Sequence, residues 1–153
     1  MDIPYGLVMR GLLKQNNKIL ILRRHPKSRT NPNRWEFPGG KVDPGEDFDK
    51  ALIREFLEET NLNIKIGDLI GAVQEDFPHK RTVTIVMGVE DIHHDPNYHD
   101  DPNCSYGEIY CSRIEISDEH TDYKWATIDE IKELDLSGNL SGWFKKLLKL
   151  NDY

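Results

Sequence analysis

Residues 39–62, GGKVDPGEDFDKALIREFLEETNL, predict a turn followed at once by a helix. The Asp-Pro-Gly run at Asp43–Gly45 has the composition of a turn. A helix is then expected from Asp47 to Thr60, with Asp47 as its N-cap. Asn61 is the expected terminator, since asparagine tolerates the left-handed backbone conformation better than most residues. The segment therefore predicts a turn followed by a helix that ends at Asn61.

Three glutamates of this helix lie on one side. Glu55, Glu58 and Glu59 are spaced i, i+3, i+4, so their carboxylates are neighbours on the helix surface. Like charges at this spacing repel by roughly 0.2–0.5 kcal/mol per pair. Arg54, four residues before Glu58, is the nearest cation, and the next one back is Lys50. The pattern indicates that something other than lysine offsets the negative charge.

The apolar residues of the helix suggest where the carboxylates lie. At about 100° per residue, Phe48 and Ala51 fall within about 40° of Glu55, and Ile53 and Leu57 form a second apolar stripe. We therefore expect a helix packed on two sides, with its carboxylates partly buried. Such carboxylates are costly unless they share a metal ion, and oxygen ligands favour Mg²⁺ or Mn²⁺. A fully solvated acidic face is the alternative.

The rest of the chain predicts a mixed α/β domain. Strands are expected at Tyr5–Lys14, Lys18–Arg24, Trp35–Gly40, Leu62–Glu75, Thr82–Val89 and Glu108–Ser117. A turn at Asn16-Asn17 separates the first two, and loops are expected at His25–Arg34 and Asp91–Gly107. A short helix capped by Thr127 is expected within Trp125–Leu134. A C-terminal helix is expected from an apolar stripe at Leu140, Trp143, Phe144, Leu147 and Leu148.

Composition excludes several classes of protein. With 153 residues and 37% hydrophobic residues, the chain can bury a core, and no linker or repeat divides it, so 1–153 is expected to be a single domain. No apolar run approaches the roughly 20 residues that span a bilayer, and no secretory leader is visible. A formal net charge of −7 disfavours duplex nucleic acid. With only two cysteines, Cys104 and Cys111, we expect a cytoplasmic protein without disulfides.

The spacing of the charged residues resembles the signature of the Nudix hydrolases, G-x5-E-x7-R-E-U-x-E-E-x-G-U, where U is a bulky apolar residue. Its positions in this chain are Gly40, Glu46, Arg54, Glu55, Phe56, Glu58, Glu59, Asn61 and Leu62. Phe56 stands where an aliphatic residue is usual, and Asn61 replaces a glycine. Neither departure changes a charged position.

Further segments are similar to the MutT-like branch of that family. They are WEFPGGK at 35–41, FPHKRTV at 77–83 and EHTDYKW at 119–125. The resemblance implies an α/β/α sandwich with a mixed β-sheet, in which residues 40–62 form the Nudix box. It also implies a monomer or homodimer that acts on a small nucleotide.

The resemblance assigns roles to residues of the box. It implies that Glu55, Glu58 and Glu59, with the backbone carbonyl of Gly39, bind Mg²⁺ or Mn²⁺. Arg54 would orient these carboxylates, and Glu46 would support the loop. Glu119, six residues before Trp125, would complete the metal site. Either Glu58 or Glu119 could accept the proton of the attacking water, and the sequence alone does not choose between them.

The implied reaction is hydrolysis of a diphosphate linkage. Divalent metals neutralise phosphate oxygens and lower the pKa of bound water. A nucleoside triphosphate, such as an oxidised purine nucleotide, would give a nucleoside monophosphate and pyrophosphate. Arg23, in a locally basic segment, is a candidate for substrate contact, with a solvated loop as the alternative. Phe77 could border the base or pack in a turn, and Asn139 could read a purine edge.

Other readings stay open. Pro78, sixteen residues after the box, is similar to a mark of ADP-ribose hydrolases, which would change the substrate and keep the mechanism. A non-catalytic module that binds nucleotides or RNA ends is a second class, although such proteins usually lose a box glutamate. A transition-metal site or a flexible hairpin tip could explain the cluster of His93, His94, His99, Asp95, Asp100 and Asp101.

Overall fold

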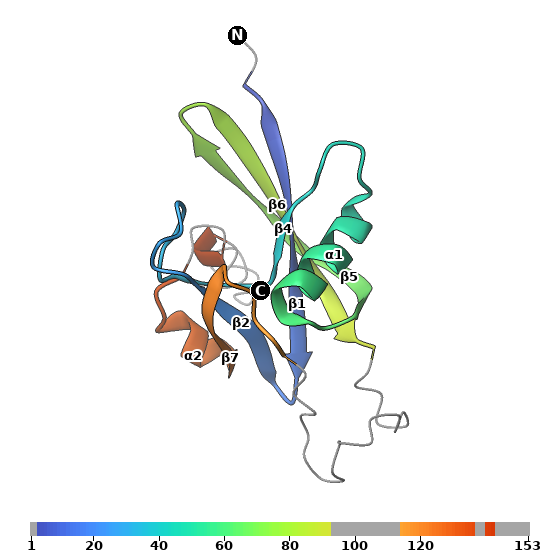
Figure 1. Ribbon diagram of the computed structural model, residues 1–153, viewed down its shortest axis with the longest axis vertical. Helices are drawn as coiled ribbons and strands as arrows, with labels where there is room; N and C mark the ends of the chain where they lie inside the picture. Colours follow the sequence, from blue (N-terminus) through green and yellow to red (C-terminus); the bar gives the residue numbers. More distant parts are fainter. Residues whose placement is uncertain (1–2, 93–113, 137–139, 143–153) are drawn as a thin grey trace, which may run out of the picture.

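The computed structural model describes residues 3–92, 114–136 and 140–142. Figure 1 shows strands crossing the centre of the molecule. The elements are β1 (Tyr5–Gln15), β2 (Lys18–Arg24), β3 (Trp35–Glu36), β4 (Gly39–Lys41), α1 (Phe48–Thr60), β5 (Ile64–Phe77), β6 (Lys80–Asp91), β7 (His120–Ala126) and α2 (Ile128–Lys132). No helix of the described residues is both long and apolar enough to cross a bilayer.

The sheet is mixed. Its order is β3-β2-β1-β6-β5, with β4 paired to β1 and β7 paired to β2. β1 and β6 run parallel, from Tyr5 opposite Arg81 to Leu13 opposite Val89, whereas the other pairs are antiparallel. The last residues of β1 turn away to pair with β2. β1 therefore joins the β4–β1–β6–β5 part of the sheet to the β3–β2–β7 part.

Two apolar clusters cover the two faces of the sheet. The α1 cluster contains Met9, Leu13, Leu20, Leu52, Phe56, Leu62, Ile64 and Val89. The α2 cluster contains Ile19, Ile21, Phe37, Val73, Val86, Ala126, Ile131 and Leu140. Figure 1 shows α1 and α2 on opposite sides of β1 and β2. This arrangement confirms the expected α/β/α sandwich with a mixed sheet.

The chain reversals follow the sequence. Asn16 and Asn17 both have positive φ, 48° and 64°, as the tight turn between β1 and β2 requires. Asn61 ends α1 at φ 64°, and its N–H donates to the carbonyl oxygen of Leu57. Asp47 occupies the N-cap position, but its side chain makes no capping hydrogen bond. Thr127 caps α2 by accepting a hydrogen bond from the N–H of Glu130.

Two of the expected elements differ from the structure. The strand expected at Trp35–Gly40 is divided into β3 and β4, because Pro38 has no N–H to donate to a ladder. Residues 114–117, the described part of the strand expected at Glu108–Ser117, are not in a strand. Their backbone donates instead to the carbonyl oxygens at the end of α1. The short helix expected within Trp125–Leu134 is confirmed as α2, which begins at Ile128 directly after its expected cap, Thr127.

The expectation that α1 is packed on two sides is wrong for the described residues. Phe48 is 49% exposed and Leu57 is 41% exposed. The helix buries one face, formed by Ala51, Leu52, Phe56, Glu59 and Thr60. Residues 52, 56 and 59 are spaced i, i+4, i+7, which sets the stripe that meets the sheet. The expected loop at 93–107 and the apolar stripe at 143–148 lie outside the described residues.

A substitution at Gly11 tests the contact between β1 and α1. A Cβ at Gly11 would lie 2.6 Å from Cε2 of the buried Phe56 ring, whereas a Cβ at Gly6 on the same strand would meet no atom closer than 3.8 Å. We expect Gly11→Ala to lower the free energy of unfolding by about 1–3 kcal/mol, as overpacking does. Gly6→Ala is the matched control for urea unfolding. Equal stability of the two variants would contradict this packing.

Candidate functional site

Arg54 fastens the start of the loop–helix unit to α1. Its Nε and one Nη make a bidentate pair with the Glu46 carboxylate, at 2.8 and 2.9 Å. Its other Nη donates to Glu55 Oε1 at 2.9 Å and lies 3.6 Å from Glu58 Oε2. The hydrogen bond from Arg54 lowers the pKa of Glu46 to about 2. One planar guanidinium therefore holds the carboxylates of Glu46 and Glu55 in place.

Glu55 lies between Arg54 and the backbone of β4. A Cβ at Gly40 would lie 2.5 Å from the carboxyl carbon of Glu55, so only glycine lets the carboxylate approach this strand. Burial raises the pKa of Glu55, although the Arg54 hydrogen bond and charge oppose that rise; Glu58 and Glu119 raise it further. The carboxylate is therefore held close to other negative charges.

Glu59 is the most buried carboxylate of the helix. Its residue is 4% exposed, and its Oε2 accepts a hydrogen bond from the N–H of Gly39 at 3.0 Å. Burial raises the pKa of Glu59 to about 8, against the opposing effects of the Arg10 charge and the Gly39 hydrogen bond. Ionisation of Glu59 at neutral pH thus requires an additional positive charge next to it.

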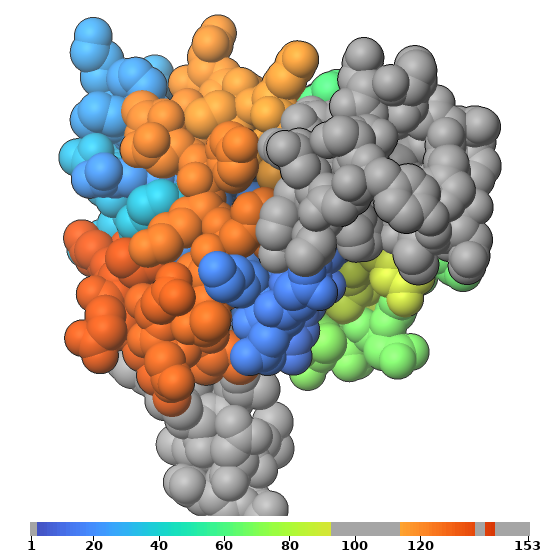
Figure 2. Space-filling model, turned by 90° about the horizontal axis from the view of Figure 1, so that it is seen from below, coloured from blue at the N-terminus to red at the C-terminus, as the bar shows by residue number. Residues whose placement is uncertain are grey.

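Glu119 and His120, where the chain enters β7, lie next to Glu59. One oxygen each of Glu59 and Glu119 and one ring nitrogen of His120 lie within 4.8 Å of one another. Glu119 precedes β7, and its carbonyl oxygen accepts a hydrogen bond from the N–H of His25 at 2.9 Å. Figure 2 shows residues 114–136 (orange) next to the loop that contains His25 (light blue). The contact fixes the backbone of Glu119 beside that loop.

His120 is turned inward at a β-bulge. Arg23 pairs with Asp122, but Arg24 pairs with His120, which leaves Thr121 as an extra residue in β7. Bulges re-aim side chains and are frequent beside functional sites. The side chain of Asp122 is 57% exposed, whereas that of His120 is completely buried.

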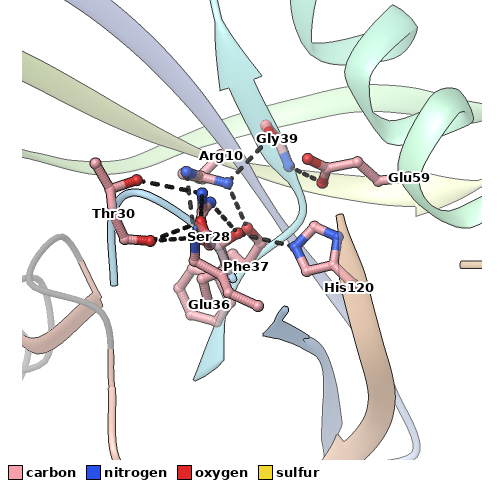
Figure 3. Close-up of polar contacts among 9 residues, drawn as sticks. Arg10, Ser28, Thr30, Glu36, Phe37, Gly39, Glu59 and His120 are labelled. Carbon is pink, nitrogen blue, oxygen red and sulfur yellow. Dashed lines mark hydrogen bonds and ion pairs between the residues drawn. The ribbon is translucent and has the colours of Figure 1, made fainter. Parts of the chain in front are cut away.

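His120 belongs to a buried ionic network centred on Glu36 (Figure 3). The Glu36 carboxylate lies 2.9 Å from His120 Nε2, 3.0 Å from Arg24 Nη1 and 3.4 Å from Arg10 Nη2. Arg10 also donates to the carbonyl oxygens of Phe37 and Gly39, both at 3.1 Å. The network therefore links β1, β2, β3 and β7, and through His120 it lies next to Glu59 and Glu119.

Glu36 should make stability depend on pH. Burial opposes its ionisation, but Arg10, His120 and Arg24 together outweigh burial and lower the pKa of Glu36 to about 2. This contribution is complete above the unfolded value of 4.5 and is lost as the pH falls towards 2. At pH 7 we expect Glu36→Gln to be less stable by roughly 2–3 kcal/mol. Urea unfolding at several pH values should show that the difference in stability between the two proteins decreases below pH 4.5. A difference in stability that does not depend on pH would contradict the lowered pKa of Glu36.

The predicted metal ligands are not equally placed. Glu55 and Glu59 face the β4 backbone, and Glu119 lies beside Glu59. The Glu58 side chain is 59% exposed and lies at the edge of this group. Gly39 presents its N–H to Glu59, whereas its carbonyl oxygen accepts from Arg10. The backbone of Gly39 is therefore next to the carboxylates, with its carbonyl already hydrogen-bonded.

Two of the predicted substrate contacts, Arg23 and Phe77, lie at or near the ends of β2 and β5. Arg23 donates to the carbonyl oxygen of Asn33 at 3.2 Å, and its side chain is 41% exposed at the end of β2. Phe77 ends β5, where Lys80 Nζ lies 5.5 Å from its ring centroid. That contact fits packing at the hairpin turn. Asn139 lies outside the described residues.

Sequence reasoning missed the residues of the ionic network. Arg10 interrupts the apolar run GLVMRGLL, and Glu36 stands between Trp35 and Phe37. A charged residue inside an apolar strand is costly unless it is paired, so these positions are a signal for a buried ion pair. No comparable local signal marks His120.

The donor set fits a divalent cation. Glu59 keeps one carboxylate oxygen beyond the bond to Gly39, and the Glu119 carboxylate lies next to it. Burial raises the pKa of Glu59 in the metal-free protein, so a cation beside it would favour the ionised carboxylate. Carboxylate oxygens grouped in this way suit Mg²⁺ or Mn²⁺.

The family comparison agrees with this geometry. The NUDIX domain family model matches residues 6–147. The chain belongs to the NUDIX family. Two of the glutamates expected in its box, Glu55 and Glu59, face β4 in the structure, and Glu59 also lies beside Glu119.

Individual NUDIX relatives refine the comparison. The 8-oxo-dGTP diphosphatase of Proteus vulgaris is 36% identical over 66 residues, covering 43% of this chain and 58% of the relative. The ADP-ribose pyrophosphatase of Methanocaldococcus jannaschii is 35% identical over 81 residues, covering 50% and 46%. The chain thus spans about half the length of these curated relatives. The MutT protein of Methanosarcina mazei Go1 has a similar structure, with a TM-score of 0.77, 25% identity and coverage of 100% and 99%.

Proposed function

We propose that this chain is a MutT-like hydrolase that cleaves a diphosphate linkage of a nucleoside triphosphate, with Mg²⁺ or Mn²⁺ as cofactor. The products would be a nucleoside monophosphate and pyrophosphate, and residues 1–153 would act as a single domain. The observation that carries the proposal is the meeting of Glu59 with Glu119 beside the Arg54-bound Glu55. The similarity to an 8-oxo-dGTP diphosphatase supports an oxidised purine nucleotide as substrate.

The residues have distinct tasks in this proposal. Glu55, Glu59 and Glu119 would hold the divalent cation, which supplies neutralisation of phosphate charge and a more acidic water. Arg54 keeps Glu55 in place through the 2.9 Å hydrogen bond. Glu58 stays outside the group of Glu59, Glu119 and His120, so its exposed carboxylate is free to accept a proton. We therefore assign the general base to Glu58 rather than Glu119.

A substrate panel tests the proposal. The protein is incubated with ordinary nucleoside triphosphates, 8-oxo-dGTP and ADP-ribose, each with Mg²⁺, with Mn²⁺ and with a chelator. We expect metal-dependent release of pyrophosphate from one or more triphosphates. Release of inorganic phosphate alone would place the cleavage at the terminal linkage and contradict the proposed products.

Hydrolysis of ADP-ribose is the second candidate function, because a relative named an ADP-ribose pyrophosphatase matches half of the chain. In the same panel it predicts AMP and ribose 5-phosphate from ADP-ribose, with little turnover of triphosphates. A non-catalytic nucleotide or RNA-end binding module predicts no turnover of any compound with either metal. The panel thus separates the three readings by product.

A further inference from the structure

One ring nitrogen of His120 is buried without a partner. Among the described residues, three buried side-chain atoms lack a hydrogen-bond partner: Arg10 Nε, Ser117 Oγ and His120 Nδ1. A buried polar atom left unpaired usually costs about 1–3 kcal/mol. A ligand bound to Nδ1 would remove this cost.

The other ring nitrogen fixes the tautomer. Nε2 lies 2.9 Å from Oε1 of Glu36, a carboxylate that also receives Arg10 and Arg24. A carboxylate in this position accepts, so Nε2 carries a proton, and in the neutral imidazole Nδ1 then presents its lone pair. Figure 3 shows the imidazole adjoining Glu36, with the Glu59 side chain nearby.

This arrangement has the form found at metal sites. A histidine that binds a metal usually donates its other ring N–H to a carboxylate, which sets the tautomer and raises the basicity of the free nitrogen. Here the carboxylate is Glu36, and one oxygen each of Glu59 and Glu119 lies within 4.8 Å of the ring. The imidazole of His120 and the two carboxylates therefore border one small volume.

We infer that His120 Nδ1 is a ligand of a divalent cation that Glu59 and Glu119 also hold. Because imidazole suits transition metals better than Mg²⁺, this position selects Mn²⁺ or Co²⁺ over Mg²⁺. The inference rests on the proposed metal-dependent function and adds a nitrogen ligand to the carboxylates of the box. A cation site built from oxygens alone would leave His120 Nδ1 buried without a partner.

The direct test is pulsed electron paramagnetic resonance of Mn²⁺ added to the full chain. A nitrogen bound to Mn²⁺ modulates the electron spin echo, and labelling histidine with ¹⁵N changes that modulation. The variant His120→Gln keeps an amide N–H for Glu36 and removes the imidazole lone pair. His79→Gln is the matched control, because His79 is exposed in the β5–β6 turn. A triple His93→Gln, His94→Gln, His99→Gln variant covers the other histidine cluster.

We expect a histidine-nitrogen modulation that is lost in His120→Gln and retained in both controls. Calorimetric titration should show Mn²⁺ affinity weakened by about 10-fold or more in His120→Gln, with a much smaller change for Mg²⁺. Mn²⁺ bound by oxygens alone in the unsubstituted protein would overturn the inference and leave the proposed function standing. A modulation that survives in His120→Gln would also overturn it. Absence of Mn²⁺ binding would overturn both.

Discussion

Glu58→Gln should lower kcat by about 100- to 10,000-fold, the range typical for loss of a general base. The side chain of Glu58 is 59% exposed, and its carboxylate makes a 3.6 Å ion pair with Arg54. Glutamine has nearly the same shape, so the fold and the Arg54–Glu46 pair should persist. The loss should therefore appear in the chemical step, with the free energy of unfolding almost unchanged.

The measurement for Glu58 is metal-dependent pyrophosphate release under saturating substrate. Glu133→Gln is the control, since Glu133 is an exposed carboxylate at the end of α2. Equal thermal unfolding of both variants shows that neither substitution disturbs the fold. Near-normal turnover of Glu58→Gln would remove Glu58 from the reaction and from any essential metal contact.

Glu59→Gln should have opposite effects on stability and activity. Burial raises the pKa of Glu59 from 4.5 to about 8, so the metal-free folded state binds more protons than the unfolded state between these values. The contribution of Glu59 to stability therefore falls as the pH rises through this window. Glutamine removes that dependence and should make the metal-free protein more stable at pH 8. Turnover should fall by at least about 100-fold, because a direct metal ligand is lost.

Thermal unfolding at pH 5 and pH 8, with and without Mn²⁺, measures this reversal. Mn²⁺ should raise the Tm of the unsubstituted protein strongly at pH 8, because ligand binding to the folded state stabilises it. The Glu59→Gln variant should start from a higher Tm at pH 8 and gain little from Mn²⁺. A metal-free variant less stable than the unsubstituted protein at pH 8 would contradict the account of Glu59.

The parts of the fold that depend on neighbouring residues were predictable from the sequence. The turn at Asn16-Asn17, the end of α1 at Asn61 and the cap at Thr127 each depend on the backbone preference of one or two residues. Local rules suffice where the interacting groups are close in sequence.

The buried face of α1 was harder to predict. Periodicity predicted that Phe48 lies on a buried stripe, but the residue is 49% exposed at the start of the helix. The sheet covers the Leu52–Phe56–Glu59 stripe, and the close approach of Gly11 to Phe56 shows why. The stripes expected from periodicity were Phe48 with Ala51 and Ile53 with Leu57, and neither is the stripe that the sheet covers. Apolar residues on several sides of a helix leave the buried face to be decided by packing against the sheet.

The remainder of the site depends on tertiary structure. The network joins Arg10 of β1, Glu36 of β3 and His120 of β7, whose positions span more than two thirds of the chain. The inward direction of His120 follows from a bulge opposite Arg23 and Arg24. Strand pairing and bulge position cannot be read from composition or spacing, so this histidine was found only in the structure.

The central claim is that Glu59 and Glu119 hold a divalent cation beside Glu55. Crystals grown with Mn²⁺ and measured at the manganese absorption edge test it most directly. We predict an anomalous peak about 2.0–2.3 Å from a carboxylate oxygen of Glu59 and of Glu119. The peak should vanish in crystals of Glu59→Gln. No peak beside these carboxylates, at a Mn²⁺ concentration that supports turnover, would contradict the account.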